Sequence, residues 1–186
     1  NKVITTGGGG MIITDDPELA KRAKYITTTA KAAHPYEFVH DEIGYNYRMG
    51  GLEGASLSVK LDYIESWNNK RRSIAEKYHE QIINPKVKLQ VVPDYADGVH
   101  HLFVVTVEDK QAFVNHLAEN DINAAYHYPI PCHLQKAYSY LGHKKGDFPK
   151  TEIQSKKILT IPIHQNLTKN QLKMIVFHLN KFAKTN

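Results

Sequence analysis

The sequence predicts an α/β protein, because short β-branched runs alternate along the chain with amphipathic helical segments. Residues 11–14 and 102–107 have the length and composition of strands. Apolar residues recur at spacings of three and four across residues 52–82, which is the period of a helix. Hydrophobic residues make up 41% of the 186, which is enough to build a packed core.

The first helix is predicted at residues 15–26, after the short strand at 11–14. Asp15 and Asp16 can cap it, Pro17 suits its first turn, and Glu18 lies near its positive end. Residues 27–50 show no sustained period and carry Gly, Pro, His and Tyr, so we expect a long loop there. Loops of this length in compact chains are usually functional or mark a misassigned element.

One long helix is predicted over residues 52–82, about 30 residues and roughly 45 Å in length. A helix this long is typical of a connection between two domains, and Asn84-Pro85 ends it. The later elements are strands at 88–92, 102–107 and 124–128, helices at 110–120, 133–141 (closed by Gly142) and 151–159, and an extended segment at 161–163. A last amphipathic helix is capped by Thr168, and the residues that share its apolar face are Leu172, Ile175, Val176 and Leu179.

The composition argues against a nucleic-acid or membrane partner. The net charge of +5 comes from 24 basic and 19 acidic residues that are mostly interspersed, so a mixed-charge surface explains it better than an anion-binding face. There is no recognisable basic-aromatic motif for reading nucleic acid. No apolar run approaches the ~20 residues that span a bilayer. Cys132 is the single cysteine, which fits a reducing, cytoplasmic location.

Three features of the sequence have to be weighed for chemistry: a glycine run, a lysine and a set of histidines. The four glycines at 7–10 suit either a tight turn into a strand or a cradle for phosphate, although the P-loop ending Gly-Lys-Ser/Thr is absent. A lone lysine such as Lys2 is ordinarily a surface residue. His127, His133 and His143 are spaced by six and ten, which does not match a helical ligand pair, so we predict no metal site.

Considered together, the first fifteen residues match a known sequence pattern. They resemble the cofactor-lysine segment of the DegT/DnrJ/EryC1/StrS family of sugar aminotransferases, which depend on pyridoxal 5'-phosphate (PLP). The matching residues are Lys2, Thr5, Thr6, Gly7, Gly9, Gly10, Thr14 and Asp15. Gly8 departs from the pattern, because many members carry Glu there. The four-glycine version resembles the branch that aminates nucleotide-linked 4-keto-6-deoxy sugars.

Two later segments extend the resemblance over nearly the whole chain. Residues 44–49, Gly-Tyr-Asn-Tyr-Arg-Met, resemble the landmark whose asparagine reaches the cofactor phosphate of the partner subunit, which implies that role for Asn46. The resemblance places Arg48 near the same site, where we expect it to bind substrate. Without the resemblance this stretch is a loop before a helix cap. Residues 127–135, His-Tyr-Pro-Ile-Pro-Cys-His-Leu-Gln, resemble a segment whose first two residues face the sugar nucleotide, which implies substrate binding by His127 and Tyr128.

The resemblance also implies a fold and a division into domains. We expect the C-terminal half of a fold-type I aminotransferase, with residues 1–50 ending the large PLP-binding domain, 51–83 forming a long connecting helix, and 84–186 forming a small α/β domain. On that helix we expect Trp67 in the core and Arg71 and Arg72 exposed.

The implied reaction is PLP-dependent transamination of a nucleotide-linked keto-deoxysugar, serving surface-polysaccharide or glycan biosynthesis. Lys2 would bind PLP covalently and then transfer protons, glutamate would donate the amine, and a cytoplasmic homodimer would share each active site. The family's partner for the pyridine nitrogen lies before the cofactor lysine, so these residues alone should bind PLP poorly and catalyse little. The alternatives are a non-catalytic relative that serves as a dimerisation or regulatory domain, and an anion- or nucleic-acid-binding module.

Overall fold

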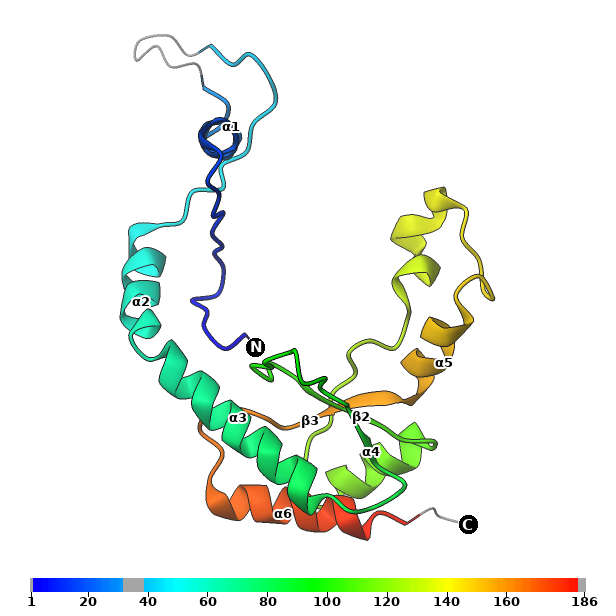
Figure 1. Ribbon diagram of the computed structural model, residues 1–186. Coiled ribbons are helices and arrows are strands. Elements are labelled where there is room, and N and C mark those ends of the chain that lie inside the picture. The colour runs from blue at the N-terminus through cyan, green and yellow to red at the C-terminus, as the bar shows by residue number, and fades with distance from the viewer. Residues whose placement is uncertain (1, 32–38, 184–186) are drawn as a thin grey trace. The chain divides into compact units, whose positions relative to one another are not determined.

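The computed structural model describes residues 2–31 and 39–183, and the chain divides into two compact units, Asn1–Ile64 and Glu65–Asn186 (Figure 1). Residues 32–38 of the predicted loop 27–50, like residue 1, lie outside the described part. The predicted assignment of residues 1–50, 51–83 and 84–186 to a large domain, a connecting helix and a small domain stays a prediction.

The first unit contains helix α1, Pro17–Thr27, which confirms the helix predicted at 15–26. Asp16 caps it, because one carboxylate oxygen accepts the backbone N–H groups of Glu18 at 2.9 Å and Leu19 at 3.1 Å. Pro17 occupies the first turn, where its missing N–H costs no helical hydrogen bond. The start of α1 is therefore fixed by neighbours within three residues in sequence.

The prediction of a buried strand at residues 11–14 is wrong. The segment has no strand pairing, and Met11 is 77% and Ile13 87% exposed. A strand requires a neighbouring strand to accept and donate its backbone hydrogen bonds. No segment among the described residues pairs with this one, so its β-branched composition alone does not make it a strand.

The single helix predicted over 52–82 is also wrong, because two helices occupy this stretch. Helix α2, Gly51–Leu61, and helix α3, Ile64–Gln81, are separated by a turn at Asp62 and Tyr63. The N–H of Tyr63 donates to the carbonyl of Lys60 at 3.1 Å, a three-residue step that tightens the end of α2. The apolar spacing continues across this break, so periodicity could not reveal it. Helix α3 ends before Asn84-Pro85, as predicted.

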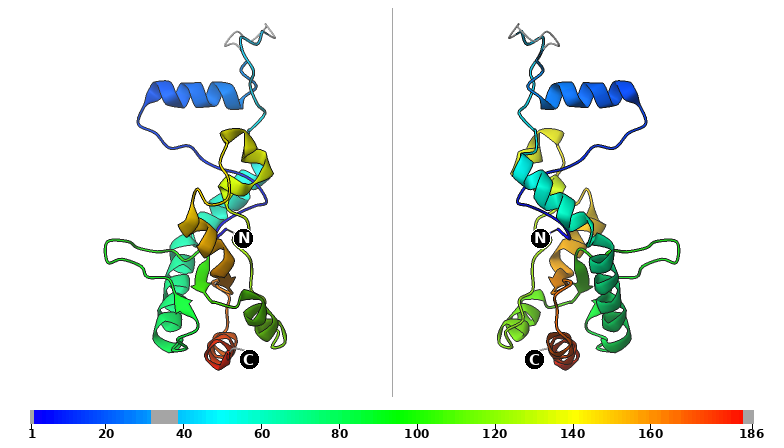
Figure 2. Two further views of the ribbon diagram at one scale, coloured as in Figure 1. Left: turned by 90° about the vertical axis from the view of Figure 1, so that its right-hand side faces the viewer. Right: turned by 90° about the vertical axis from the view of Figure 1, so that its left-hand side faces the viewer.

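The second unit contains a three-stranded antiparallel sheet in the order β1-β2-β3. Its strands are β1, Lys88–Leu89, β2, Phe103–Thr106, and β3, Ile158–Ile161. The strand predicted at 102–107 is confirmed, whereas the strand predicted at 88–92 keeps only its first two residues. Figure 2 shows the chain between β1 and β2 as a loop that projects from the sheet.

One face of this sheet is covered by helices. Phe103 pairs with Ile161 and Val105 with Leu159, and all four side chains are buried on that face. They pack with apolar residues of α3, of helix α4, Lys110–Ala118, and of helix α6, Lys169–Lys181. Thr168 caps α6 through a capping box with Gln171, as its sequence predicts. The predicted buried face of α6 is confirmed for Leu172, Ile175, Val176 and Leu179.

Helix α3 corrects the expectations for three residues. Arg71 is not exposed but 4% accessible, and its Nη1 donates to the carbonyls of His100 and Ile163, each at 3.1 Å. Trp67 is half-buried rather than a core residue. Arg72 is also half-buried and makes a two-pronged ion pair with Asp97, at 3.0 and 2.9 Å. Arg71 thus stabilises the packing of α3 against two segments distant in sequence.

Residues 124–141 differ from their predicted form. The strand at 124–128 is reduced to one bridge between Ala125 and Thr160, and it ends before Pro129 and Pro131, which lack the N–H that a ladder requires. The helix predicted at 133–141 is two 3-10 helices, η1, Cys132–Leu134, and η2, Lys136–Leu141. Gly142 closes η2 at φ 76°, as predicted. Helix α5, Pro149–Lys157, then leads into β3.

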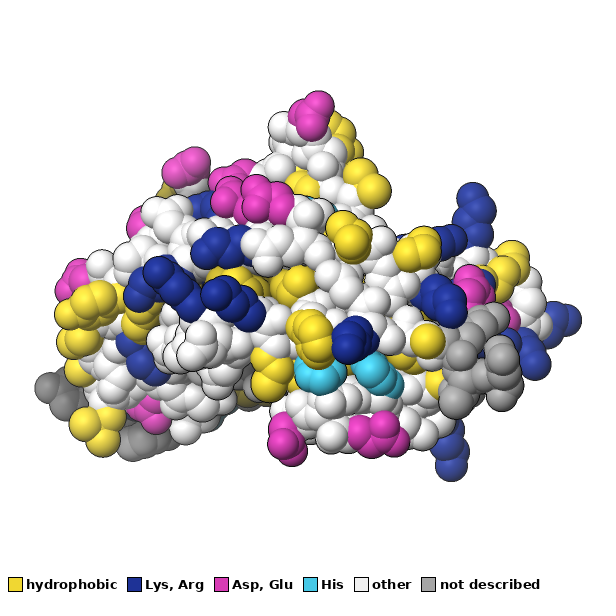
Figure 3. Space-filling model, turned by 90° about the horizontal axis from the view of Figure 1, so that it is seen from below, with side chains coloured by type: hydrophobic (Ala, Val, Ile, Leu, Met, Phe, Trp, Pro, Cys, Tyr) yellow, Lys and Arg dark blue, Asp and Glu magenta, His cyan; other side chains and the backbone are white. Residues whose placement is uncertain are grey.

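Basic and acidic side chains are interspersed on the face drawn in Figure 3, in keeping with the mixed-charge surface expected from composition. Within the described ranges, no helix combines the length and apolar character needed to cross a bilayer.

Candidate active site

A tight glycine turn follows Lys2 in the first unit. Gly7 has φ 98° and Gly9 has φ 123°, conformations that side chains with a Cβ rarely adopt. The hydroxyl of Thr5 accepts the N–H of Gly7 at 3.2 Å, and the ammonium group of Lys60 donates to the carbonyl of Thr5. Because Lys60 belongs to α2, this helix anchors the chain three residues after Lys2.

Lys2 itself presents an exposed side chain. Among the residues that the structure describes, none makes a hydrogen bond or an ion pair with its amine. The residue therefore offers a primary amine on a short lead into an anchored turn. An amine that is not committed to a carboxylate can act as a nucleophile once it is deprotonated.

The segment that carries Asn46 is fixed against the end of α1. The N–H of Tyr45 donates to the carbonyl of Ile26 at 2.8 Å, and the N–H of Tyr47 donates to that of Thr27 at 3.0 Å. The rings of Tyr45 and Tyr47 stack with centroids 5.0 Å apart. Backbone bonds on both sides of Asn46 therefore determine where its side chain starts.

The structure brings Asn46 and Arg48 into contact. The Nε of Arg48 donates to the side-chain carbonyl of Asn46 at 3.3 Å. This contact leaves the Asn46 amide N–H groups and the terminal guanidinium nitrogens of Arg48 available as donors within the described part of the chain. Such donors suit the oxygens of a phosphate, and the guanidinium adds a positive charge.

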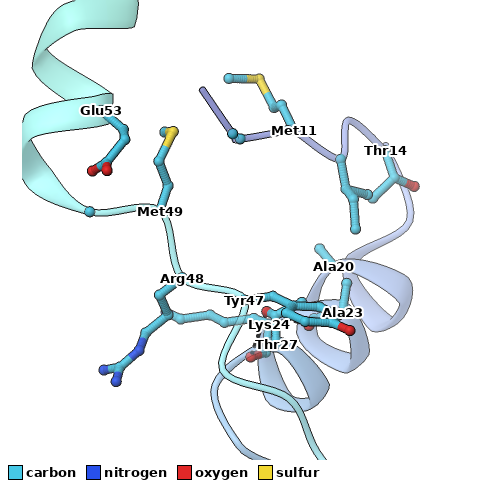
Figure 4. Close-up of a pocket in the computed structure, with 15 residues that line it drawn as sticks. Met11, Thr14, Ala20, Ala23, Lys24, Thr27, Tyr47, Arg48, Met49 and Glu53 are labelled. Carbon is cyan, nitrogen blue, oxygen red and sulfur yellow. Dashed lines mark hydrogen bonds between the residues drawn. The ribbon is translucent and has the colours of Figure 1, made fainter. Parts of the chain in front are cut away.

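A cavity of about 930 Å³ lies beside these residues in the first unit (Figure 4). Its walls come from the glycine turn and the segment after it, from one side of α1, and from residues 47–53 at the start of α2. Arg48 is one of the lining residues, but Lys2 and Asn46 are not. In Figure 4 the Arg48 side chain extends away from the segment that carries Met11 and Thr14.

Sequence reasoning missed three polar residues that line this cavity: Lys24, Thr27 and Glu53. Glu53 carries a detectable signal, because it is the third residue of a helix, where acids favour the positive helix end. Its carboxylate folds back over Gly50, such that a Cβ built at Gly50 would lie 2.3 Å from the carboxylate oxygen Oε2. Lys24 and Thr27 lie in the last turns of α1 and had no distinguishing pattern.

His127 and Tyr128 belong to the second unit. The ring Nδ1 of His127 lies 3.0 Å from the hydroxyl of Thr160, while Tyr128 is 68% exposed. Their rings meet edge to face, with centroids 5.2 Å apart. His127 is therefore oriented by the sheet, and Tyr128 presents its phenol to the surroundings.

His133 has a structural contact that its sequence did not reveal. Its Nε2 lies 3.1 Å from the carboxylate of Glu152, which also accepts the N–H of Gly146 at 2.7 Å. These contacts hold the pKa of Glu152 below its usual range, with the Gly146 N–H having the larger effect and the His133 ring the smaller one. His143 is 3.7 Å from Asp147. In the described ranges, no three His, Cys, Asp or Glu side chains are grouped to hold a metal ion.

The comparisons with known proteins agree on one family. The profile of the DegT/DnrJ/EryC1/StrS aminotransferase family matches residues 1–180. A dTDP-3-amino-3,6-dideoxy-alpha-D-galactopyranose transaminase from Aneurinibacillus thermoaerophilus is 38% identical over 175 residues, 94% of this chain and 47% of that protein. The erythromycin biosynthesis sensory transduction protein EryC1 from Saccharopolyspora erythraea is 32% identical, over 95% of this chain and 48% of its own length.

The fold agrees with solved structures as well. DesV from Streptomyces venezuelae superposes with a TM-score of 0.84 at 29% identity, over 91% of this chain and 45% of that one. The chain thus spans about half the length of the relatives that it matches. Members of this family depend on PLP, and solved neighbours include forms with PLP and with pyridoxamine phosphate. With a family profile that covers residues 1–180 and relatives that match nearly all of it, the chain belongs to the DegT/DnrJ/EryC1/StrS aminotransferase family.

Proposed function

We propose that this chain carries the cofactor lysine of a PLP-dependent aminotransferase that acts on a nucleotide-linked keto-deoxysugar. The observation that carries the proposal is Lys2: a primary amine, unengaged by the described residues, just before a glycine turn, in a chain that the family profile matches from residue 1 to residue 180.

The donor set of the first unit fits PLP. Lys2 supplies an amine for the cofactor's aldehyde, and Asn46 supplies amide donors for its phosphate, with the charged guanidinium of Arg48 beside it. When bound, PLP supplies the electron sink for the bonds made and broken at the substrate carbon. The residues of the chain have to hold it, orient it and manage the protons.

Lys2 performs two tasks in this proposal. Its Nζ would hold the cofactor through a covalent bond that an incoming amine can displace. The freed Nζ would then act as a general base on the substrate carbon and as a general acid that returns the proton to the cofactor's C4′ carbon. The anchor of the turn by Lys60 supports this role, because it limits how far the amine can travel between the two positions.

The remaining predicted residues bind rather than react. Asn46 serves the cofactor phosphate in the site of a partner subunit of a homodimer. Arg48, His127 and Tyr128 contact the sugar nucleotide, and glutamate is the amine donor. The substrate class is supported by the relative named as a dTDP-amino-sugar transaminase. A cytoplasmic step in surface-polysaccharide or glycan synthesis fits this chemistry.

The test is amino transfer by the whole protein, with glutamate as donor and a dTDP-linked keto-deoxysugar as acceptor. Lys2→Ala should lower the rate by at least about 10³-fold, because both covalent and proton-transfer catalysis are lost. Lys21→Ala is the matched control, since Lys21 is another exposed lysine of the same unit that does not line the cavity, and it should change the rate less than about three-fold. Equal effects of the two variants would contradict the assignment.

One observation favours a second function. One of the relatives is named as a sensory transduction protein. A non-catalytic relative that dimerises or regulates would fit that name. It predicts that Lys2→Ala leaves activity in the cell unchanged, whereas the enzyme proposal predicts that the variant cannot replace the wild type.

A further inference from the structure

Thr160 occupies an unusual position for a buried polar residue. It is 7% exposed and lies in β3 between Leu159 and Ile161, whose side chains face the helices. Alternation along the strand directs Thr160 to the opposite face of the sheet, where its cross-strand partner is Val104. The hydroxyl on this face meets the ring of His127 at 3.0 Å.

The backbone next to His127 is attached to the same residue of the sheet. The N–H of Ala125 donates to the carbonyl of Thr160, and the N–H of Thr160 donates to that of Ala125, each at 2.9 Å. Tyr126 stands between Ala125 and His127 in the sequence. The ammonium nitrogen of Lys110 lies over its ring, 5.2 Å from the ring centroid. Lys110 is held in turn by the carbonyl of Ser155 at 2.8 Å. Residues 125–127 therefore have little freedom to move relative to β3.

The donors and acceptors then select one form of the imidazole ring. A threonine hydroxyl has one hydrogen, and a neutral histidine has one N–H and one bare nitrogen. If Nδ1 carried the hydrogen, the buried Thr160 hydroxyl would accept it, and its own hydrogen would have no acceptor among the described residues. An unmatched buried donor is costly, whereas an unmatched lone pair costs less.

We propose that Thr160 is a positioning residue that donates its hydroxyl hydrogen to His127 Nδ1 and thereby keeps the N–H on Nε2, as a donor aimed away from the sheet. The ligand for this donor is an acceptor oxygen of the sugar nucleotide, a hydroxyl or a phosphate. That second half rests on the proposed function. The first half concerns the free protein and stands without any substrate.

Nitrogen NMR of the histidine rings tests the first half directly. Long-range proton–nitrogen correlations of the wild-type protein at neutral pH distinguish the two tautomers, with His127→Gln to assign the signal. We expect the Nε2–H tautomer for His127. The Nδ1–H tautomer in the wild type would overturn the proposal without the need for any Thr160 variant.

Three variants test whether Thr160 is the cause. Thr160→Val keeps the shape and the backbone bonds but removes the hydroxyl, so the His127 signal should shift towards a mixture of tautomers. Thr160→Ser retains the hydroxyl and should restore the wild-type pattern. Thr106→Val removes a hydroxyl from β2 on the same sheet face, without a described contact to His127, and should change nothing. An unchanged tautomer in Thr160→Val would contradict the proposal.

Kinetics of the whole enzyme test the ligand half. Loss of one oriented hydrogen bond should raise KM for the sugar nucleotide about five-fold in Thr160→Val, leave KM for glutamate unchanged, and be reversed in Thr160→Ser. A shifted tautomer with an unchanged KM would rule out Nε2 as the contact to the nucleotide sugar. If Lys2 fails to hold PLP while the tautomer behaves as expected, the proposed function fails but the role of Thr160 does not.

Discussion

Gly44 has no room for a side chain. A Cβ built there lies 2.3 Å from both the backbone nitrogen of Ala30 and the backbone carbon of Thr29, which are main-chain atoms that cannot rotate away. The glycine allows the chain that precedes Asn46 to lie directly against the end of α1. The position of Asn46, which is predicted to contact the cofactor, therefore depends on Gly44 two residues earlier.

Gly44→Ala should lower the free energy of unfolding by about 1–3 kcal/mol, because backbone segments must separate to admit the methyl group. Gly51→Ala is the control, since a Cβ there meets nothing within 4 Å and alanine favours the helix. Urea unfolding of both variants checks this. Equal stability of the two would show that the close approach at Gly44 is not present in solution.

Arg71 should be among the most sensitive positions of the second unit. Arg71→Met fills much of the same space but leaves the carbonyls of His100 and Ile163 without their donor, so we expect a loss of about 3 kcal/mol of unfolding free energy. Lys70→Met, at an exposed neighbour, should stay within about 0.5 kcal/mol of the wild type. Denaturant midpoints would separate the two variants, and a tolerant Arg71→Met would contradict its structural role.

Arg71 also marks a limit of prediction from single residues. It precedes Ile74 and Tyr78 by three and seven positions, so helical spacing places all three on the buried face. Its charge argued for exposure, and the charge was misleading. The carbonyl of Ile163 that compensates for burial lies 92 positions away in sequence, which no local pattern reveals.

The helices illustrate what local chemistry can predict. Asp16 and Thr168 cap α1 and α6 as expected, because a cap depends on residues within one turn of the helix start. The strand predicted at 11–14 was wrong, because no described segment pairs with it. The strand predicted at 124–128 is reduced to the single bridge between Ala125 and Thr160. At the site, Asn46 and Arg48 lie in contact, and their roles stay predictions. Thr160 and Glu152, like Lys24 and Thr27 at the cavity, emerged only from packing.

The segment from η1 to α5 should weaken in acid through Glu152. The pKa of this carboxyl is lowered in the folded chain, chiefly by the Gly146 N–H, so its contribution to stability is present above the ordinary carboxyl pKa of about 4.3 and is lost as the pH falls through the lowered value. Glu152→Gln should therefore flatten the fall in urea midpoint below that pH. Glu119→Gln, at the end of α4, is the control and should keep the wild-type dependence of the urea midpoint on pH. The same wild-type dependence in Glu152→Gln would be inconsistent with a lowered pKa of Glu152.

At the scale of the whole molecule, the proposal that Asn46 serves the partner's cofactor makes a prediction about mixtures. Lys2→Ala and Asn46→Ala are each expected to be impaired as homodimers. When equal amounts of the two variants are refolded together, each mixed dimer has an intact Lys2 on the Asn46→Ala subunit and an intact Asn46 on the Lys2→Ala subunit. Because half of the dimers are mixed and each has one complete site, about a quarter of the wild-type sites should return. No recovery above the separate variants would show that Asn46 serves its own subunit.

The proposed enzyme requires Lys2 to be the residue that binds the cofactor. The most direct measurement is borohydride reduction of the whole protein after addition of PLP, followed by digestion and mass analysis of every lysine peptide. We predict a stoichiometric pyridoxyl phosphate adduct on Lys2 and none on Lys24 or Lys60. A reduced adduct on another lysine, with Lys2 unmodified, would contradict the central claim.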